Sequence, residues 1–456
     1  MTLITTLSTT PMGTGKTTRR RLTAQGIAFA GVLGVACSTG GAGGGAALPA
    51  KQVRTGFTLN WRSYVNNEPL MTEINRQWTA KHPQVKLSHS FATAAEILQK
   101  LSAEVAAGTP PDVSMLGYRD VPAVQRHLLS LEPYMRRDKY AIQDFVPAAV
   151  NQYKYGASYY ALPNSFPVRV GVYNASLFRE RGVKPPPTTW DGAWSWDEHT
   201  AATRALTGAR GEEQVWGMSW DKSAAVPNLL QVMLFCNNNG GAFLREDGKE
   251  CLINQPRSRE ALQYMQDLIQ RHHTAPVPAS LQQPNADLFV QGKAAWGSFG
   301  PASVAAYRRQ LTFEWALGPL PLGPGAKQRT TIMDGSAWMA LRDGANREEA
   351  WELIQTLVSP EYERAAADLQ GYVPARRALM AEYTATEPPK NAKIMLEASE
   401  RTYLLPKTPW AAEADTTVAP LLGELWAGKK SANAVADEAK RLLDPILQKE
   451  FSFRTD

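Results

Sequence analysis

The alternation of apolar and polar positions predicts an α/β domain in the first part of the chain after residue 52. "VRTGFTLNW", "VKLSHSF" and "DVSML" are short runs rich in β-branched and aromatic residues, which is typical of strands. Between them, residues 68–82 have the period of a helix. The stretch "TAAEILQKLSAEVAAG" also has this period and begins with a capping box of Thr93 and Glu96. Strand-helix-strand-helix-strand at this spacing predicts parallel pairing.

A second α/β region is expected from about Val168 to Leu317, with a capping box formed by Ser195 and Glu198. A connection rich in proline and glycine then leads to a strand within "GSAWMAL". Helices are expected at residues 258–271, 347–358 and 361–369, and from about residue 391 onward. A chain of this length exceeds what one hydrophobic core usually serves, so we expect two domains.

The N-terminal stretch predicts an export signal over residues 1–36 and not a nucleotide-binding loop. "GTGKT" at residues 13–17 lacks the first glycine of a phosphate-binding loop, because Thr10 stands in its place. Three arginines at 19–21 precede the short apolar run "LTAQGIAFAGVLGVAC", which is the order of regions in a signal peptide. Sec export and twin-arginine export both fit this pattern.

The end of the signal is similar to a bacterial lipobox, in which the cysteine is lipidated and becomes the new N-terminus. In "LGVAC" the cysteine is Cys37, Leu33 lies one position early, and Gly34 stands where leucine is usual. Residues 37–52 are rich in glycine and alanine, and a flexible tether of about 15 such residues reaches roughly 20 Å. We therefore expect a globular body held near a membrane by an N-terminal lipid.

Composition and charge exclude other classes. The chain has 456 residues, of which 44% are hydrophobic and 20% charged, as in globular proteins. Lys16 and the arginines at 19–21 supply four of the six net positive charges, which leaves about +2 (6 − 4) after the signal. No basic run remains that would bind nucleic acid, and no later segment has the 18 or so consecutive apolar residues of a membrane span.

Two cysteines remain besides Cys37, and they predict a disulfide. Cys236 and Cys251 flank "NNNGGAFLREDGKE", a hairpin that we expect to turn at Asp247-Gly248. In an oxidising compartment a bridge closing this loop would stabilise the fold by roughly 3 kcal/mol. Two buried free thiols are the alternative.

Further stretches are informative through their order along the chain. They are "LSAEVAAGTPPDVSML", "YYALPNSFPVRVGVYNASLFRERGVKPPPTTW", "NNGGAFLREDGKECLINQPRSREALQYMQDL", "FVQGKAAWGSFGP", "LGPLPLGPG", "GSAWMAL" and "AWELIQTLVSPEYERAAADLQGYVPARRAL". Together they resemble the family 1 extracellular solute-binding proteins, which are the ligand-capturing subunits of bacterial ABC importers, most often for sugars. The resemblance covers nearly the whole chain after the signal.

The resemblance implies a type II periplasmic-binding-protein-like fold, with two α/β lobes, hinge crossings and a ligand cleft between the lobes. The crossings are expected near residues 162–166, 320–324 and 373–376. The implied lobes are residues 53–164 plus 322–374 and residues 165–321 plus 375–456. We expect a monomer that needs no cofactor or metal, catalyses nothing and meets the permease subunits of an importer.

Sugar sites combine aromatic faces with polar side chains, and strand ends at the cleft are the first place to look. Trp61 ends the first strand, although a core tryptophan is an equal alternative. Asp120 follows "DVSML", with a solvated turn as its alternative. Asn164 and Ser165 lie at the first expected crossing.

The resemblance adds further candidates in the second half of the chain. Asp334, Gly335 and Ser336 correspond to a close backbone approach to the ligand, and Asp334 could accept from sugar hydroxyls. Arg376 follows "GYVP" at the third crossing and alternatively forms an interlobe salt bridge. Trp410 and Phe299 stand at positions where relatives often have a cleft aromatic, and Phe299 replaces the more common tryptophan.

Three rival functions remain open. A secreted carbohydrate-active enzyme would need a positioned pair of carboxylates, for which Asp120 and Asp334 could be imagined. A metal receptor could use Tyr159 and Tyr160, although packing accounts for them better. A polyamine or peptide receptor on the same fold is a rival as well, and polyamines would require several acids in the cleft.

Overall fold

The computed structural model describes residue 54 and residues 56–65, 68–220, 226–277, 287–299, 302–333 and 335–455. The expected export signal, Cys37, the tether and Asp334 lie outside the described residues. Within the described ranges, no helix has both the length and the apolar character that crossing a bilayer requires.

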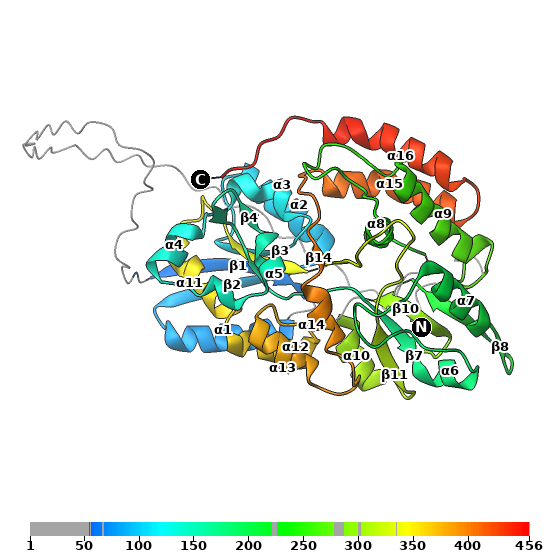
Figure 1. The fold of residues 1–456 in the computed structure, drawn as a ribbon. Coiled ribbons are helices and arrows are strands. Elements are labelled where there is room, and N and C mark those ends of the chain that lie inside the picture. The colour runs from blue at the N-terminus through cyan, green and yellow to red at the C-terminus, as the bar shows by residue number, and fades with distance from the viewer. Residues whose placement is uncertain are drawn as a thin grey trace, which may run out of the picture. The chain divides into compact units, whose positions relative to one another are not determined.

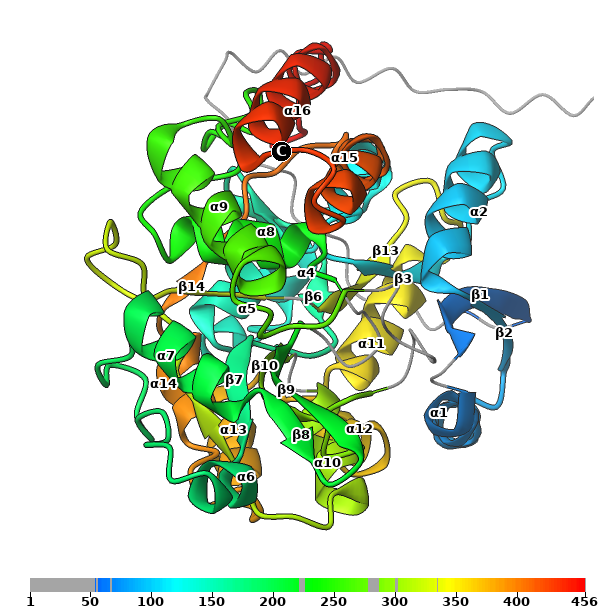
Figure 2. The same cartoon turned by 90° about the vertical axis from the view of Figure 1, so that its right-hand side faces the viewer.

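Within the described residues, the first sheet has five strands in the order β2-β1-β3-β13-β6 (Figures 1 and 2). β1 pairs in parallel with β2 and β3, as the sequence predicted, and β13 runs antiparallel to both β3 and β6. The predicted capping box of Thr93 and Glu96 is present at the start of α2. The elements on this side are β1 (Phe57–Tyr64), α1 (Glu68–Lys81), β2 (Val85–Ala92), α2 (Ala94–Ala106), β3 (Val113–Gly117), α3 (Val121–Val124), η2 (Gln125–His127), α4 (Glu132–Arg137), η3 (Ile142–Asp144), α5 (Pro147–Asn151), β4 (Lys154–Tyr155), β5 (Ser158–Tyr159), β6 (Leu162–Pro163), β13 (Ser336–Ala340), α11 (Arg347–Leu357) and α12 (Pro360–Gln370).

The second sheet has five strands in the order β11-β7-β10-β9-β8. β10 is parallel to β9 and antiparallel to β7, so this sheet is mixed. The predicted capping box of Ser195 and Glu198 begins α7, and the helix expected at 258–271 is α9. The elements here are β7 (Val170–Asn174), α6 (Ala175–Glu180), α7 (Trp196–Leu206), β8 (Gly208–Arg210), β9 (Glu213–Ser219), α8 (Leu229–Asn237), α9 (Pro256–Gln270), β10 (Ala294–Phe299), α10 (Ala302–Gln310) and β11 (Trp315–Gly318).

Three segments far apart in the sequence lie side by side where the chain passes between the two sheets. The amide of Phe166 donates to the carbonyl of Val373 (2.8 Å), and Val168 forms a β-bridge with Met333. Nearby, β12 (Thr331–Ile332) pairs in parallel with β14 (Thr402–Tyr403). Phe166 and Val373 fall within the expected crossings at 162–166 and 373–376. The segment 331–333 lies beyond the expected crossing at 320–324, where the amide of Leu322 instead donates to the carbonyl of Trp194 on the second-sheet side (2.8 Å). The lobe boundaries themselves stay a prediction.

The chain ends in helices that pack on the second-sheet side and in a tail that returns to the first. The helices are α13 (Arg377–Thr384), α14 (Ile394–Ser399), α15 (Ala411–Trp426) and α16 (Ala432–Leu447), and both views show α15 and α16 beside α8 and α9 (Figures 1 and 2). From α16 the tail runs back toward α3, which directly precedes η2 (Figure 1). There the buried Gln125 side chain donates to the carbonyl of Arg454 (2.8 Å) and accepts from its amide (2.9 Å).

Deleting residues 449–456 is expected to lower the free energy of unfolding by about 2 kcal/mol. The deletion removes both hydrogen bonds of Gln125 and the contact of the Phe453 ring with Tyr155, whose centroids are 4.8 Å apart. Each hydrogen bond contributes about 1 kcal/mol, and part of the ring burial is lost as well. Urea unfolding of the truncated and full chains measures the difference, with Ser452→Ala as the control. Equal stability would mean that the tail contributes nothing to the fold.

The predicted disulfide is absent, and this corrects the sequence-based expectation. Cys236 and Cys251 are both free and buried. The Cys236 thiol donates instead to the carbonyl of Ser258 (3.9 Å), and burial raises the pKa of each thiol to about 12. Both thiols are therefore neutral and act as small apolar core groups. The hairpin between them turns at Asp247-Gly248 as predicted, with Gly248 at φ 71°.

Candidate functional site

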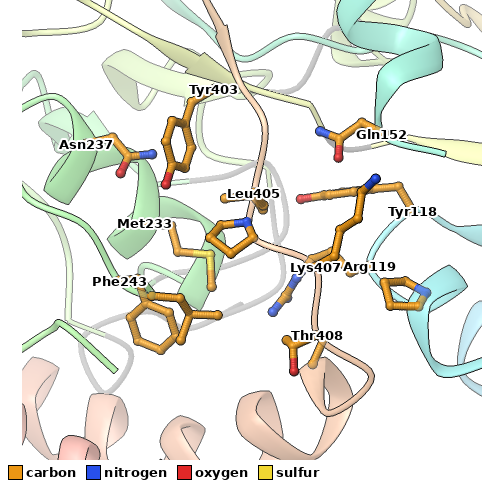
Figure 3. Close-up of a pocket in the computed structure, with 14 residues that line it drawn as sticks. Tyr118, Arg119, Gln152, Met233, Asn237, Phe243, Tyr403, Leu405, Lys407 and Thr408 are labelled. Carbon is orange, nitrogen blue, oxygen red and sulfur yellow. The ribbon is translucent and has the colours of Figure 1, made fainter. Parts of the chain in front are cut away.

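A pocket lies between elements of the first-sheet side and helices of the second-sheet side (Figure 3). One wall comes from the segment after β3 and from the end of α5, and the opposite wall from α8 and the hairpin that follows it. The segment between β14 and α15 runs between these walls. The lining residues are Tyr118, Arg119, Pro122, Gln152, Met233, Asn237, Phe243, Leu244, Tyr403, Leu405, Pro406, Lys407, Thr408 and Ala411.

Strand ends explain why these residues meet. β3 ends at Gly117, and the amide of Tyr118 then donates to the carbonyl of Gly335 (3.0 Å), just before β13. Tyr118 and Arg119 therefore follow the carboxyl end of a parallel strand, which is where open α/β sheets place their ligands. Asn237 is the last residue of α8 and faces this end from the other side (Figure 3).

The pocket is narrow in this structure. The space in it that can hold the centre of a water molecule is about 30 Å³. Pockets for drug-sized ligands usually enclose roughly 300–1,000 Å³. A ligand as wide as a sugar ring therefore requires the two walls to move apart before it enters.

An ion pair connects the two walls beside the pocket. The Arg119 guanidinium donates to both carboxylate oxygens of Asp415 on α15, and the second of these contacts is 2.6 Å long. Asp120 lies next to this pair, and burial raises the pKa of its carboxyl above the ordinary value, opposed by Arg119 and reinforced by Asp415. Arg119 is thus already neutralised by a protein carboxylate.

Two buried amide groups on opposite walls have no hydrogen-bond partner among the residues that the structure describes. They are Nε2 of Gln152, on the first-sheet side, and Nδ2 of Asn237, on the second. An unpaired buried N–H group is unfavourable by about 1–3 kcal/mol, so these donors are available to a ligand. The rings of Tyr118, Phe243 and Tyr403 add aromatic surface to the same pocket (Figure 3).

Five of the residues predicted from the sequence lie together beside the carboxyl end of β3. Ser336 pairs with Gly117, the amide of Asn164 donates to the carbonyl of Ser336 (2.9 Å), and a side chain at Gly335 would touch the carbonyl of Ser165. Asp120 is the fifth, and one of its carboxylate oxygens would lie 3.2 Å from a Cβ at Gly117. None of the five lines the pocket described above.

Asn164 is held inside the protein. Its side-chain oxygen accepts from Trp338 Nε1 (3.1 Å) and from the Tyr362 hydroxyl (2.8 Å), and its side chain is 2% exposed. Its side-chain amide lies 3.4 Å from the Ser336 hydroxyl. The arrangement fixes the end of β6 against β13 and leaves the Asn164 oxygen no capacity for a ligand.

The structure places the other predicted residues elsewhere. Trp61 is 1% exposed, stacks on His89 at 3.8 Å and donates to Asn75, which is the core role that the sequence left open. Trp410 precedes α15 and has the Lys449 ammonium 5.0 Å from its ring. Phe299 ends β10, and the structure does not describe its side chain.

Arg376 is engaged by protein groups and not by the pocket. Its guanidinium donates to the carbonyl of Val358 (3.1 Å) and to the Tyr140 hydroxyl (3.1 Å), and it lies 4.4 Å from the centre of the Phe145 ring. Glu363 lies 3.7 Å away. Asp144 of η3 is a second and nearer partner, at 3.3 Å. These contacts are salt bridges, as the alternative interpretation of the sequence had it, and both partners belong to the first-sheet side.

None of the described candidate residues from the sequence lines the pocket, and Gln152, Asn237, Tyr403 and Lys407 are among the lining residues that the sequence did not predict. Asn237 directly precedes "NNGGAF", one of the stretches that carry the resemblance, and Tyr403 lies seven residues before the candidate Trp410. Gln152 carries no local signal, because it follows a single helical turn in an otherwise irregular segment. Among the described residues, no cluster of histidine, cysteine or acidic side chains could hold a metal ion.

Comparisons with known proteins agree with this geometry. A family model described as "Bacterial extracellular solute-binding protein" matches residues 62–364. A binding protein of Brucella abortus (strain 2308) is 25% identical over 390 residues, which are 84% of this chain and 90% of that protein.

Solved structures give the same result for the fold. An ABC substrate-binding protein from Listeria monocytogenes in complex with cycloalternan has a TM-score of 0.74 at 22% identity, covering 86% of this chain and 99% of that one. UgpB from Mycobacterium tuberculosis in complex with glycerophosphocholine has a TM-score of 0.71 at 19% identity, covering 86% and 98%. The fold is therefore of the type II periplasmic-binding-protein class, and both the family and these neighbours are solute-binding proteins, not enzymes.

Proposed function

Because the chain belongs to the bacterial extracellular solute-binding proteins, the substrate-binding subunits of ABC importers, we propose that it captures a sugar or an oligosaccharide in the pocket between its two sheets. The observation that carries the proposal is the pair of unpartnered amides, Gln152 and Asn237, on opposite walls of an aromatic pocket. Sugar rings stack on aromatic faces while their hydroxyls take hydrogen bonds from polar groups of this kind. The captured solute is then delivered to the permease subunits in the membrane.

A polyamine receptor is less well supported. Polyamines carry several positive charges, and their binding needs carboxylates in the pocket. Among the described residues no aspartate or glutamate lines it, whereas Arg119 and Lys407 do. The lining thus favours a hydroxyl-rich solute over a cationic one.

Binding would work by a shift in population between an open and a closed form. Gln152 and Asn237 lie on different walls, so a ligand that bonds to both stabilises only the form in which the walls are close. For this movement we propose the lobes 53–164 plus 322–374 and 165–321 plus 375–456, which turn about the segments that lie side by side between the sheets. The permease would recognise the closed form.

The N-terminal region would keep the receptor at the cell surface. We propose that residues 1–36 are removed as an export signal, that Cys37 receives a lipid and that residues 37–52 form the tether. A monomeric body on such a tether meets the permease without a membrane span of its own.

Replacing Gln152 or Asn237 by alanine is expected to weaken saccharide binding about tenfold each, because each change removes a hydrogen bond worth roughly 1–1.5 kcal/mol. The ligand is first found by thermal shift of the tether-free body against a panel of mono- and oligosaccharides. A saturating ligand at a hundred times its Kd adds about 2.7 kcal/mol to stability. Calorimetry then gives Kd for each variant.

Gln310→Ala is the matched control, since Gln310 is an exposed amide at the end of α10. It should bind as the parent protein does. A saccharide that binds equally well to the parent and to both pocket variants would place the sugar site elsewhere. A saccharide recovered in cleaved form would contradict the receptor role.

A further inference from the structure

The charged groups that line the pocket are all positive, and hydroxyls of Tyr118, Tyr403 and Thr408 line it as well. Two groups carry positive charge, Arg119 and Lys407, and two are amides with unpartnered N–H groups, Gln152 and Asn237. No carboxylate lines the pocket within the described part of the chain. The pocket therefore offers many hydrogen-bond donors and, apart from neutral oxygens, nothing that accepts strongly.

Of the two positive charges in the pocket, that of Lys407 has no acidic partner in the part of the chain that the structure describes. Its ammonium donates to the carbonyl of Lys154, lies 3.4 Å from the carbonyl of Asn151 and is 4.1 Å from the centre of the Tyr155 ring. No salt bridge joins it to a carboxylate among the described residues. Arg119, by contrast, is paired with Asp415.

A neutral sugar would use this lining only in part, because it leaves the positive charge of Lys407 without a counter-charge. Each sugar hydroxyl has a proton to donate, and carboxylates are the acceptors that take such protons most strongly. A phosphoryl or carboxylate group has only acceptor oxygens and a negative charge. It would satisfy the amide donors and also supply a counter-charge to the half-buried ammonium of Lys407.

We infer that the solute is a sugar or small polyol that carries a phosphoryl or carboxylate group, and that Lys407 is the residue that selects for this charge. The inference rests on the proposed function, because it concerns the ligand of the same pocket. Gln152 and Asn237 hold the acceptor oxygens from the two walls, and the aromatic rings pack against the rest of the solute.

Matched pairs of solutes test the inference by calorimetry on the full folded body. Glucose is compared with glucose 6-phosphate and with glucuronate, and glycerol is compared with glycerol 3-phosphate. Inorganic phosphate alone is included, so that the phosphoryl and carboxylate arms and the bare anion are distinguished. The charged member of a pair should bind at least tenfold more tightly than its neutral counterpart, and added salt should reduce this preference.

Two substitutions assign the preference to one residue. Lys407→Gln should weaken binding of the charged solute about 10- to 100-fold, the range expected when a hydrogen bond to a charged group is lost, and should leave the neutral solute nearly unchanged. Lys407→Arg should retain the preference, which guards against a variant that only disturbs packing. Lys86→Gln removes the same charge from an exposed position on β2 and should change nothing.

The outcomes separate this inference from the function on which it rests. Neutral sugars that bind as tightly as their charged counterparts would overturn the inference and leave the sugar receptor standing. A preference for the charged solute that survives in Lys407→Gln would overturn the role of Lys407. If neither member of any pair binds while a neutral oligosaccharide of the panel does, the inference fails and the receptor function stands. If nothing in the pairs or the panel binds, both fail together.

Discussion

Replacing Arg376 by alanine is expected to lower the free energy of unfolding by about 3–5 kcal/mol and to leave ligand affinity unchanged. The side chain of Arg376 is 11% exposed, and that of its partner Glu363 is 0% exposed. Removing one member of a buried ion pair leaves the other charge without compensation, which is the origin of the large loss. Urea unfolding and calorimetry on the same samples measure the two quantities.

Glu363 is what makes the change so unfavourable. Its Oε2 accepts from the amides of Ala375 and Arg376 (3.0 and 3.1 Å), so it fixes the backbone where the third of the side-by-side segments ends. Burial raises its pKa to about 7, and the two amides and the Arg376 guanidinium oppose this rise. Without the guanidinium the pKa of Glu363 should rise further.

The loss in Arg376→Ala should therefore depend on pH. The folded-state pKa of Glu363, about 7, lies above its ordinary 4.5. Between these two pH values the folded protein keeps this proton while the unfolded chain loses it, so stability falls as pH rises from 4.5 to about 7. The deficit of the variant should be larger at pH 8 than at pH 5. Adding Glu363→Gln, which still accepts from both amides, should recover part of the stability at pH 8. A variant of normal stability that binds ligand weakly would restore Arg376 to the site.

Arg376 illustrates why the fold could be predicted more fully than the site. Strands, helices and capping boxes depend on neighbours within a few residues, so β1, α2 and α7 could be predicted from local patterns. The role of Arg376 depends on Tyr140 and Glu363, which only the folded chain brings to it. A motif at a hinge shows that a residue is near the cleft, but not which way its side chain points.

The same reason accounts for the buried position of Trp61 and for the amides that were missed. Trp61 ends its predicted strand segment, but β1 continues to Tyr64, so Trp61 lies inside the sheet with His89 across its face. Gln152 and Asn237 were invisible because an amide becomes informative only when its lack of a partner is known. The disulfide prediction failed for a similar reason, since the spacing of two cysteines does not show the direction of their thiols.

Acid should destabilise this protein through His199. Between pH 7 and pH 4.5 the free energy of unfolding should fall by about 2.7 kcal/mol less in His199→Gln than in the parent protein. His199 is 0% exposed, and its Nδ1 lies 2.7 Å from the Tyr264 hydroxyl. Its Nε2 has no hydrogen-bond partner within the described ranges. Burial lowers its pKa from the ordinary 6.5 to about 3, because a charged ring is unfavourable among Trp194, Trp296 and Tyr264.

The sign follows from proton binding in the two states. Below pH 6.5 the unfolded chain protonates His199 and the folded chain does not, so stability is lost as pH falls toward 3, by about 1.4 kcal/mol per pH unit. Glu363 acts in the opposite direction, since the folded state gains stability as pH falls from about 7 to 4.5. The parent protein alone therefore shows only the balance of the two, whereas the difference between the parent and His199→Gln isolates the histidine because Glu363 is common to both. Glutamine can still form a hydrogen bond with the Tyr264 hydroxyl, and it does not titrate. Parallel stability–pH profiles for the two proteins would contradict the prediction, because they would mean that the folded protein protonates His199 as readily as the unfolded chain does.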